Sequence, residues 1–340
     1  MTAVVPFAKN AFPCPGDWRL TLTIPDPLPA FDQLPVADGA PPQSGWWLFG
    51  KDDQVGLFNL QTPERIAAAA RLVTRGTMFP LNWEMELPAP PLYGRGAVRQ
   101  TIFRNPNGHD DVLDNFFPQA SSQWDSLVHV GHPQHGFYNG IAPEDVTGQP
   151  GTRGGIEHWA RRGIAGRGVL LDAARFLEQA GRPIDAGERI AITVDDLEAC
   201  RAAQGVEIHP GDVLIIRTGW IPWYLQQDAA TRRAITVPAN LKAPGLASGE
   251  TMARYLWDLH VVAACSDNPA LEAWPPLPEA GGFLHWYLIG LFGMAIGELW
   301  YLEALAADCA SDGRYEFFFT SAPLNKLGGV GSPPNAIAFK

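Results

Sequence analysis

The sequence predicts one large domain of the α/β or α+β class, and three observations support this. Short apolar runs bounded by glycine or polar residues recur at 168–172, 211–219 and 261–265, as in strands that are buried on both faces. Segments with helix-start signals lie between these runs. Hydrophobic residues form 46% of the 340 residues, so the chain can bury a large core.

The domain is predicted over residues 46–340, preceded by an arm. Residues 1–45 are rich in proline and lack periodicity, which is typical of a segment laid over the protein's own surface or over a partner subunit. The chain holds 35 Gly and 31 Pro but only 18% charged residues. This composition favours a compact protein with many turns and long ordered loops.

Helices are predicted where capping signals precede apolar residues. Thr62 and Pro63 start a helix with its body at 66–73, and Thr193 starts one that runs to about Gln204, with Asp196 completing a capping-box arrangement. The other predicted segments are strands at 77–88 and 99–104, a polar loop at 105–111, a Gly-rich lid or connection at 146–155, helices at 156–162, 173–180 and 251–259, a strand or loop leading into a long apolar helix at 283–307, and a strand at 314–320.

Composition excludes several function classes. A net charge of -11 without a basic run argues against a nucleic-acid partner. The most membrane-like segment, 286–305, is interrupted by Glu298, Glu303 and three glycines, so we expect a buried helix and no membrane contact. No signal peptide is expected, and the scattered Cys14, Cys200, Cys265 and Cys309 are typical of buried free thiols, which together predict a cytoplasmic protein. The chain lacks the Gly-x-Ser-x-Gly motif of a serine hydrolase.

Candidate functional residues concentrate in Gln119-Ala-Ser-Ser-Gln123-Trp-Asp125-Ser-Leu-Val-His129. In a strand, Gln123 and Asp125 point to the same face because side chains alternate. A helical turn would place Asp125 and His129, four residues apart, on one side. A strand that runs into a turn can therefore bring these three side chains together. His132 and His135 follow, so three of the eight His lie within seven residues.

At this stretch the sequence resembles the cyclase-type metal-dependent hydrolases, which include kynurenine formamidase and isatin hydrolase. Their fingerprint is His-x-Gly-Thr-His-x-Asp-x-Pro-x-His. Here its His positions fall on Gln119, Gln123 and His129, and its Asp falls on Asp125. The Gln form is similar to a branch of the family that resembles trans-dienelactone hydrolase. The resemblance covers residue 45 to the end, through 168–172, 211–219, Ser266-Asp267, 285–298 and the terminal Gly-Ser-Pro.

The resemblance implies a β/β/α layered swivelling domain that forms a homodimer or homotetramer. It also implies a metal site made of Gln119, Gln123, Asp125, His129, His285 and Glu298. Independently of the resemblance, Glu298 is a carboxylate inside an apolar stretch, and such a group needs a buried partner. With two Gln in place of His, oxygen donors favour Mn²⁺, while Zn²⁺ binds intrinsically more tightly. One ion or two would fit.

The expected reaction is the hydrolysis of a small molecule by a water that the metal activates. His129 and Glu298 are expected to be catalytic as well as ligands, and His132 or His135 to carry a proton to the leaving group. Asp267 is a candidate to orient a metal-bound His. Trp124, Phe137, Tyr138 and Trp286 are candidates for an apolar wall.

The substrate stays open at this point. The Gln form suggests a dienelactone-like lactone, and a formamidase-type amide substrate would use the same chemistry. An acidic substrate would need an arginine, for which Arg104, Arg161 and Arg217 are unranked candidates. Gln123 stands where a non-haem iron oxygenase would need His. The serious alternative is a non-catalytic binding protein that has lost the metal site.

Overall fold

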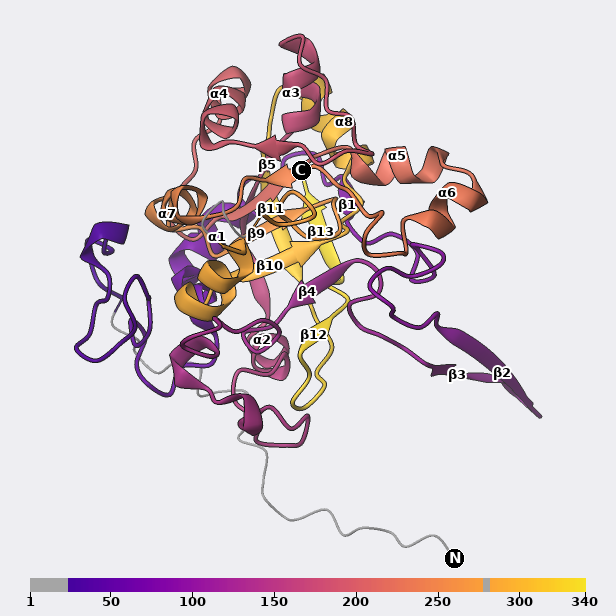
Figure 1. Cartoon of the computed structure of the whole chain (residues 1–340), viewed down its shortest axis with the longest axis horizontal. Coiled ribbons are helices and arrows are strands. Elements are labelled where there is room, and N and C mark those ends of the chain that lie inside the picture. The colour runs from indigo at the N-terminus through magenta and orange to yellow at the C-terminus, as the bar shows by residue number, and fades with distance from the viewer. Residues whose placement is uncertain (1–23, 278–281) are drawn as a thin grey trace, which may run out of the picture.

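The computed structural model describes residues 24–277 and 282–340, and its centre is one mixed sheet (Figure 1). In these residues the sheet has nine strands in the order β1-β13-β11-β5-β7-β9-β10-β4-β12. The α/β class predicted from the sequence is confirmed. The strands of this sheet are β1 (Met78–Pro80), β4 (Gln123–Asp125), β5 (Ile164–Leu171), β7 (Val213–Ile216), β9 (Ala263–Ser266), β10 (Ala295–Glu298), β11 (Glu316–Ser321), β12 (Gly331–Ser332) and β13 (Ala336–Phe339).

The middle of the sheet is parallel and its flanks are antiparallel. β5, β7, β9 and β10 run in the same direction, while β11, β13 and β1 on one side and β4 and β12 on the other are antiparallel to their neighbours. Every residue of β7, β9 and β10 is buried, which accounts for their continuous apolar sequences. The helices are α1 (Pro63–Ala70), α2 (Glu157–Arg162), α3 (Ala173–Gln179), α4 (Val194–Gln204), α5 (Trp220–Gln226), α6 (Ala229–Ala234), α7 (Glu250–Asp258), α8 (Glu303–Asp312) and the π-helix η6 (Trp286–Phe292).

Capping signals located the helix starts well. The Thr62 hydroxyl accepts a hydrogen bond from the backbone of Arg65 at the start of α1, and Thr193 forms the predicted capping box with Asp196 at the start of α4. α1 ends at Ala70, earlier than the predicted body at 66–73.

Three of the predicted segments were wrong. The long helix at 283–307 is instead η6, β10 and α8, and Gly293, with a φ of 68°, ends η6 in the left-handed region. The polar loop at 105–111 is instead the end of a hairpin: Asn105 ends β2 (Arg99–Asn105), residues 106–107 form the turn, and residues 108–111 belong to β3 (Gly108–Asp114), which pairs with β2. Of the strand at 77–88, only β1 forms. A smaller parallel pair, β6 (Ala191–Ile192) with β8 (Gly245–Leu246), completes the described strands.

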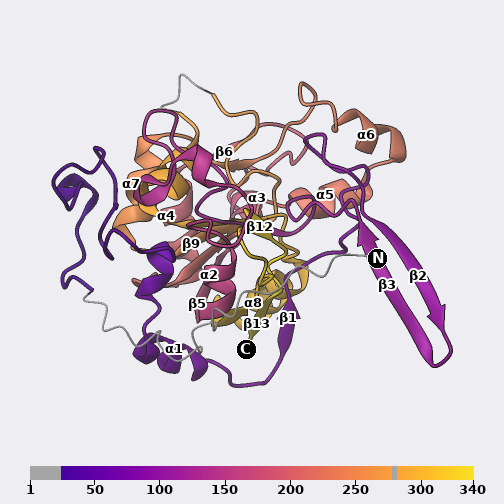
Figure 2. The same cartoon turned by 90° about the horizontal axis from the view of Figure 1, so that it is seen from below.

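The β2–β3 hairpin projects away from the body of the protein in both views (Figure 1, Figure 2). All residues of β2 are exposed, and so are all of β3 except Gly108. The chain leaves this hairpin directly toward Gln119, so the hairpin precedes the candidate functional stretch.

An aromatic core lies behind β4. The fully buried Trp124 makes edge-to-face contacts with Phe58, Trp159 and Trp300, at centroid distances of 5.7, 6.1 and 4.8 Å. The Trp300 indole also donates to the backbone oxygen of Gln123 over 3.1 Å. This packing fixes β4 and leaves the side chains of Gln123 and Asp125 on its other face.

The described part of the N-terminal arm packs on α7. The Trp257 indole donates to Pro29 O over 2.8 Å, and Phe31 N donates to Asp258 over 2.7 Å. Cys200, Cys265 and Cys309 are buried free thiols, as predicted, while Cys14 lies outside the described residues. No helix in the described residues has the length and apolarity needed to cross a membrane.

Candidate metal centre

Strand register builds the site from residues far apart in sequence. β4 and β10 are antiparallel, with Gln123 opposite Glu298. Directly paired residues share a face of the sheet, and Asp125 lies on that same face two residues further along β4. The prediction that Gln123 and Asp125 lie on one face of a strand is therefore confirmed, and β10 places Glu298 on the same face.

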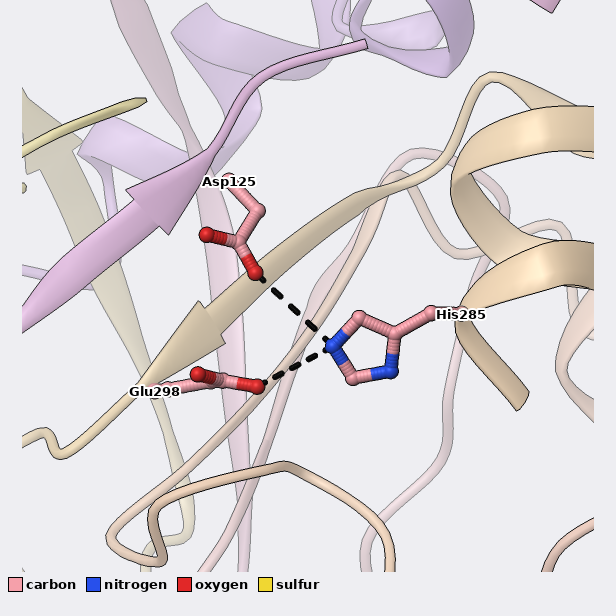
Figure 3. Close-up of side chains that lie close together, drawn as sticks. All are labelled: Asp125, His285 and Glu298. Carbon is pink, nitrogen blue, oxygen red and sulfur yellow. Dashed lines mark hydrogen bonds and ion pairs between the residues drawn. The ribbon is translucent and has the colours of Figure 1, made fainter. Parts of the chain in front are cut away.

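His285 completes a buried cluster with these carboxylates. It stands immediately before η6 and points at Asp125 and Glu298 (Figure 3). Its Nε2 lies 3.1 Å from Glu298 Oε1 and 3.8 Å from Asp125 Oδ2. One potential ligand atom from each of the three residues lies within 4.8 Å of the others, and all three side chains are buried.

Glu272 holds His285 from the other side. Its Oε1 lies 3.2 Å from His285 Nδ1 and accepts a hydrogen bond from Leu284 N over 2.8 Å, while Oε2 accepts one from Ser248 over 2.7 Å. Burial alone would lower the pKa of His285, but hydrogen bonds to Glu272 and Glu298 raise that pKa to about 10. Without a cation, the imidazole is therefore protonated and sits between two carboxylates.

Asp125 is the carboxylate of the cluster that accepts no hydrogen bond, although His129 and His285 lie near its oxygens. Both of its carboxylate oxygens are buried and neither accepts a hydrogen bond. Burial raises the pKa of Asp125 to about 6, although the nearby His129 lowers it. Buried charges are normally paired or bind a metal. The donor set of two carboxylates and an imidazole, with open oxygens on Asp125, fits a divalent cation.

His129 lies beside Asp125 but outside the tight cluster. Its Nε2 is 3.5 Å from Asp125 Oδ1, the oxygen that does not face His285. Burial lowers the pKa of His129, and the charge of Asp125 raises it. The imidazole is neutral near pH 7, as a metal ligand or a proton acceptor must be.

The two glutamines direct their amide nitrogens at other site residues. Gln123 Nε2 donates to Glu298 Oε2 over 2.5 Å, and Gln119 Nε2 lies 3.5 Å from His129 Nδ1. Of the two side-chain amide oxygens, only Gln123 Oε1 is buried without a hydrogen-bond partner. In this arrangement the glutamines orient Glu298 and His129, and their role as ligands stays a prediction.

His132 and His135 form a stacked pair next to Trp286, the residue that follows His285. Their ring centroids are 4.7 Å apart, and His132 also contacts Trp286 edge-to-face at 6.2 Å. Burial lowers the pKa of His132, and the neighbouring His135 lowers it further.

Two expectations about neighbouring residues need correction. Asp267 accepts hydrogen bonds from the backbones of Thr218 and Gly219, so it joins the ends of β7 and β9 and does not orient a metal-bound His. Glu272, and not Asp267, contacts His285, and its signal in the sequence was a single acidic residue in the apolar stretch after β9. Trp124 and Tyr138 are fully buried core residues, so they form no wall.

Comparison with protein families gives one match. The model of the Cyclase family, described as "Putative cyclase", matches residues 60–273. This segment contains Gln119 to His129 and Glu272. No curated protein matches the sequence.

Comparison with solved structures gives the same fold. A crystal structure described as a novel cyclase is 35% identical, covers 87% of this chain and 99% of its own, and has a TM-score of 0.77. Isatin hydrolase A from Labrenzia aggregata, bound to benzyl benzoate, is 15% identical over 77% of this chain and 93% of its own, with a TM-score of 0.55. An isatin hydrolase bound to the product analogue thioisatinate is 17% identical over 77% and 91%, with a TM-score of 0.51.

Proposed function

Because the chain belongs to the Cyclase family, we propose that it is a metal-dependent hydrolase that cleaves an acyl bond of a small molecule. The observation that carries the proposal is the buried cluster of Asp125, His285 and Glu298, in which both oxygens of Asp125 have no hydrogen-bond partner. Maintaining such a carboxylate costs stability, and a functional site is where that cost is expected.

Asp125, His285 and Glu298 would hold the cation, with His129 as a further ligand. Glu272 accepts a hydrogen bond from His285 Nδ1, which leaves Nε2 as the atom available to a metal. Asp125 presents one oxygen to His285 and the other to His129, so the same residues could hold one ion or two. Mn²⁺ and Zn²⁺ both accept this mixed oxygen and nitrogen donor set.

When bound, the cation supplies a water whose pKa is lowered toward about 7 and polarises the carbonyl of the substrate. The protein's own residues then handle the protons. His132, half-buried next to Trp286, is neutral near pH 7 because its pKa is lowered. It can therefore accept a proton and return it to the leaving oxygen or nitrogen, with His135 as its stacked neighbour.

A lactone is the substrate that we favour. The support is the pair Gln119 and Gln123 at positions where the formamidase and isatin hydrolase fingerprint has His, a form similar to the trans-dienelactone hydrolase branch. A formamidase-type amide is the second candidate, because the same groups would cleave a C–N bond.

The test combines metal content with activity. We expect one or two equivalents of Mn or Zn per chain in protein purified without added metal, and hydrolysis in a screen of lactones and aryl formamides. Asp125→Ala should abolish both, while the control Asp110→Ala, on the exposed β3 strand, should change neither. Failure to bind or take up metal would favour the non-catalytic binding protein, and activity retained by Asp125→Ala would overturn the proposal.

A further inference from the structure

Arg95 is a cation next to the metal centre without an acidic partner. Its Nη1 donates to the backbone oxygen of Gln119, and its guanidinium lies 5.1 Å from the centroid of the Tyr93 ring. Across residues 24–277 and 282–340, the Arg95 guanidinium forms no ion pair with a carboxylate and makes no other hydrogen bond. Most of the five N–H donors of its guanidinium are therefore free.

Contacts connect Arg95 to the cluster. The Gln119 backbone accepts its hydrogen bond, the Gln119 side chain lies 3.5 Å from His129 Nδ1, and His129 Nε2 lies 3.5 Å from Asp125. Burial raises the pKa of Asp125, and the charge of Arg95 is among those that lower it. The guanidinium is thus within electrostatic reach of the proposed reaction centre.

Contacts between aromatic rings lead from Arg95 to His285. Tyr93 contacts Trp274 at 5.3 Å, Trp274 contacts Phe283 at 6.4 Å, and Phe283 stacks on His285 at 4.2 Å with an interplanar angle of 3°. A flat, unsaturated ring suits such a wall. This series of contacts has Arg95 at one end and His285 at the other.

The arginines named from the sequence do not lie in this position. Arg217 is bound by Asp172 and Glu303, Arg104 is exposed on β2, and Arg161 is exposed on α2. The acidic groups of the centre contact histidines and not Arg95 in the described residues: Glu272 and Glu298 contact His285, and Asp125 faces His129 and His285. The Arg95 guanidinium is therefore available to a negatively charged ligand.

We propose that Arg95 binds a carboxylate carried by the substrate, so that the enzyme selects anionic unsaturated lactones or amides over neutral ones. This rests on the proposed hydrolase function and adds the substrate class to it. A guanidinium binds a carboxylate through two parallel N–H···O bonds, which fixes its orientation as well as its position. The scissile carbonyl would then be held at a defined distance from the anchoring carboxylate.

The experiment compares two lactones that differ only in charge. One is an unsaturated five-membered lactone with a carboxymethyl substituent, and the other is its carboxamide. With the metal-loaded protein, we expect Arg95→Gln to raise the KM for the carboxylate about 10- to 100-fold and to leave the carboxamide within about threefold. Gln at position 95 keeps a donor for the Gln119 backbone oxygen. Arg95→Lys keeps the positive charge and should recover part of the affinity for the carboxylate that Arg95→Gln loses. Arg104→Gln, on the exposed β2 strand, is the matched control.

Binding separates this proposal from the hydrolase proposal. (3-Oxocyclopentyl)acetate carries the same carboxymethyl group on a ring that cannot be hydrolysed, and calorimetry gives its Kd without any turnover. We expect Arg95→Gln to weaken its binding about tenfold or more, even if no lactone is cleaved. Equal losses for the carboxylate and the carboxamide would show that Arg95 only positions Gln119, and an unchanged Kd would overturn the proposal.

Discussion

Asp125→Asn should stabilise the metal-free protein, although it removes a residue of the proposed active site. The wild-type carboxylate is fully buried, and neither of its oxygens accepts a hydrogen bond. Its pKa is raised by burial from an ordinary 3.8 to about 6. Two pKa units correspond to about 3 kcal/mol of cost for the ionised form, at about 1.4 kcal/mol per unit. An amide of the same shape avoids that cost.

The pH dependence gives the sign of the effect. Because the pKa is higher in the folded state, the folded protein binds more protons between about pH 4 and pH 6, so wild-type stability falls as the pH rises through this window. The variant has no such group. Its advantage should be near zero at about pH 3 and below, where Asp125 is mostly protonated in both states, and reach about 3 kcal/mol at pH 8.

Adding metal should reverse the order of stability. A cation at 1,000 times its Kd stabilises the wild type by about 4 kcal/mol, which exceeds the variant's advantage of about 3 kcal/mol, while a variant that cannot bind gains nothing. Urea unfolding followed by tryptophan fluorescence, in EDTA and then in saturating Mn²⁺, measures both states. If Asp125→Asn is less stable than the wild type in EDTA at pH 8, or is stabilised equally by metal, the reasoning is refuted.

Asp267 provides the matched control. It is equally buried, and burial likewise raises its pKa to about 6. Its oxygens, however, accept hydrogen bonds from Thr218 N, the Thr218 hydroxyl and Gly219 N, over 2.6, 2.7 and 2.8 Å. An amide nitrogen in Asp267→Asn would face these donors, and each unsatisfied donor costs about 1–3 kcal/mol. We therefore expect no net stabilisation from Asp267→Asn.

Two further predictions concern His285. Hydrogen bonds to Glu272 and Glu298 raise its pKa to about 10, against the effect of burial. At pH 8, binding of a cation through Nε2 should therefore release one proton. The apparent affinity for the cation should rise about tenfold per pH unit from pH 7 to 9. Calorimetry in buffers of different ionisation enthalpy counts the proton, and a count of zero would exclude His285 as a ligand. Glu272→Gln should weaken metal binding about 10- to 100-fold, as measured by chelator competition, because the neutral amide no longer strengthens the imidazole as a donor. Unchanged affinity would contradict the role given to Glu272.

Local rules were sufficient for part of the site. The alternation of side chains along a strand placed Gln123 and Asp125 on one face before any tertiary structure was known, and the capping residues Thr62 and Thr193 marked real helix starts. These predictions hold because each depends on neighbours within a few residues. The pairing of Gln123 with Glu298 joins residues 175 positions apart, and no local pattern encodes it.

The errors have physical causes. The segment 283–307 looked like one apolar helix because buried strands and buried helices are equally apolar, and only the left-handed Gly293 and the sheet register distinguish them. Residues 105–111 looked like a loop because polarity usually marks loops, whereas a projecting hairpin is exposed on both faces and carries polar residues throughout. Glu272 was missed because an acidic residue after a strand gives no sign of the partner it will meet.

The distribution of hydrogen bonds indicates where the reaction should occur. Each oxygen of Glu272 has a partner, and Glu298 is held by His285 and Gln123. Asp125 alone keeps both oxygens open, one toward His285 and the other toward His129. Since Asp125 has the unused hydrogen-bonding capacity of the cluster, we expect a bound cation on that side. His129 borders Asp125 and contacts Gln119, whose backbone holds Arg95, so a substrate anchored at Arg95 would place its carbonyl beside a cation held by the open oxygens of Asp125.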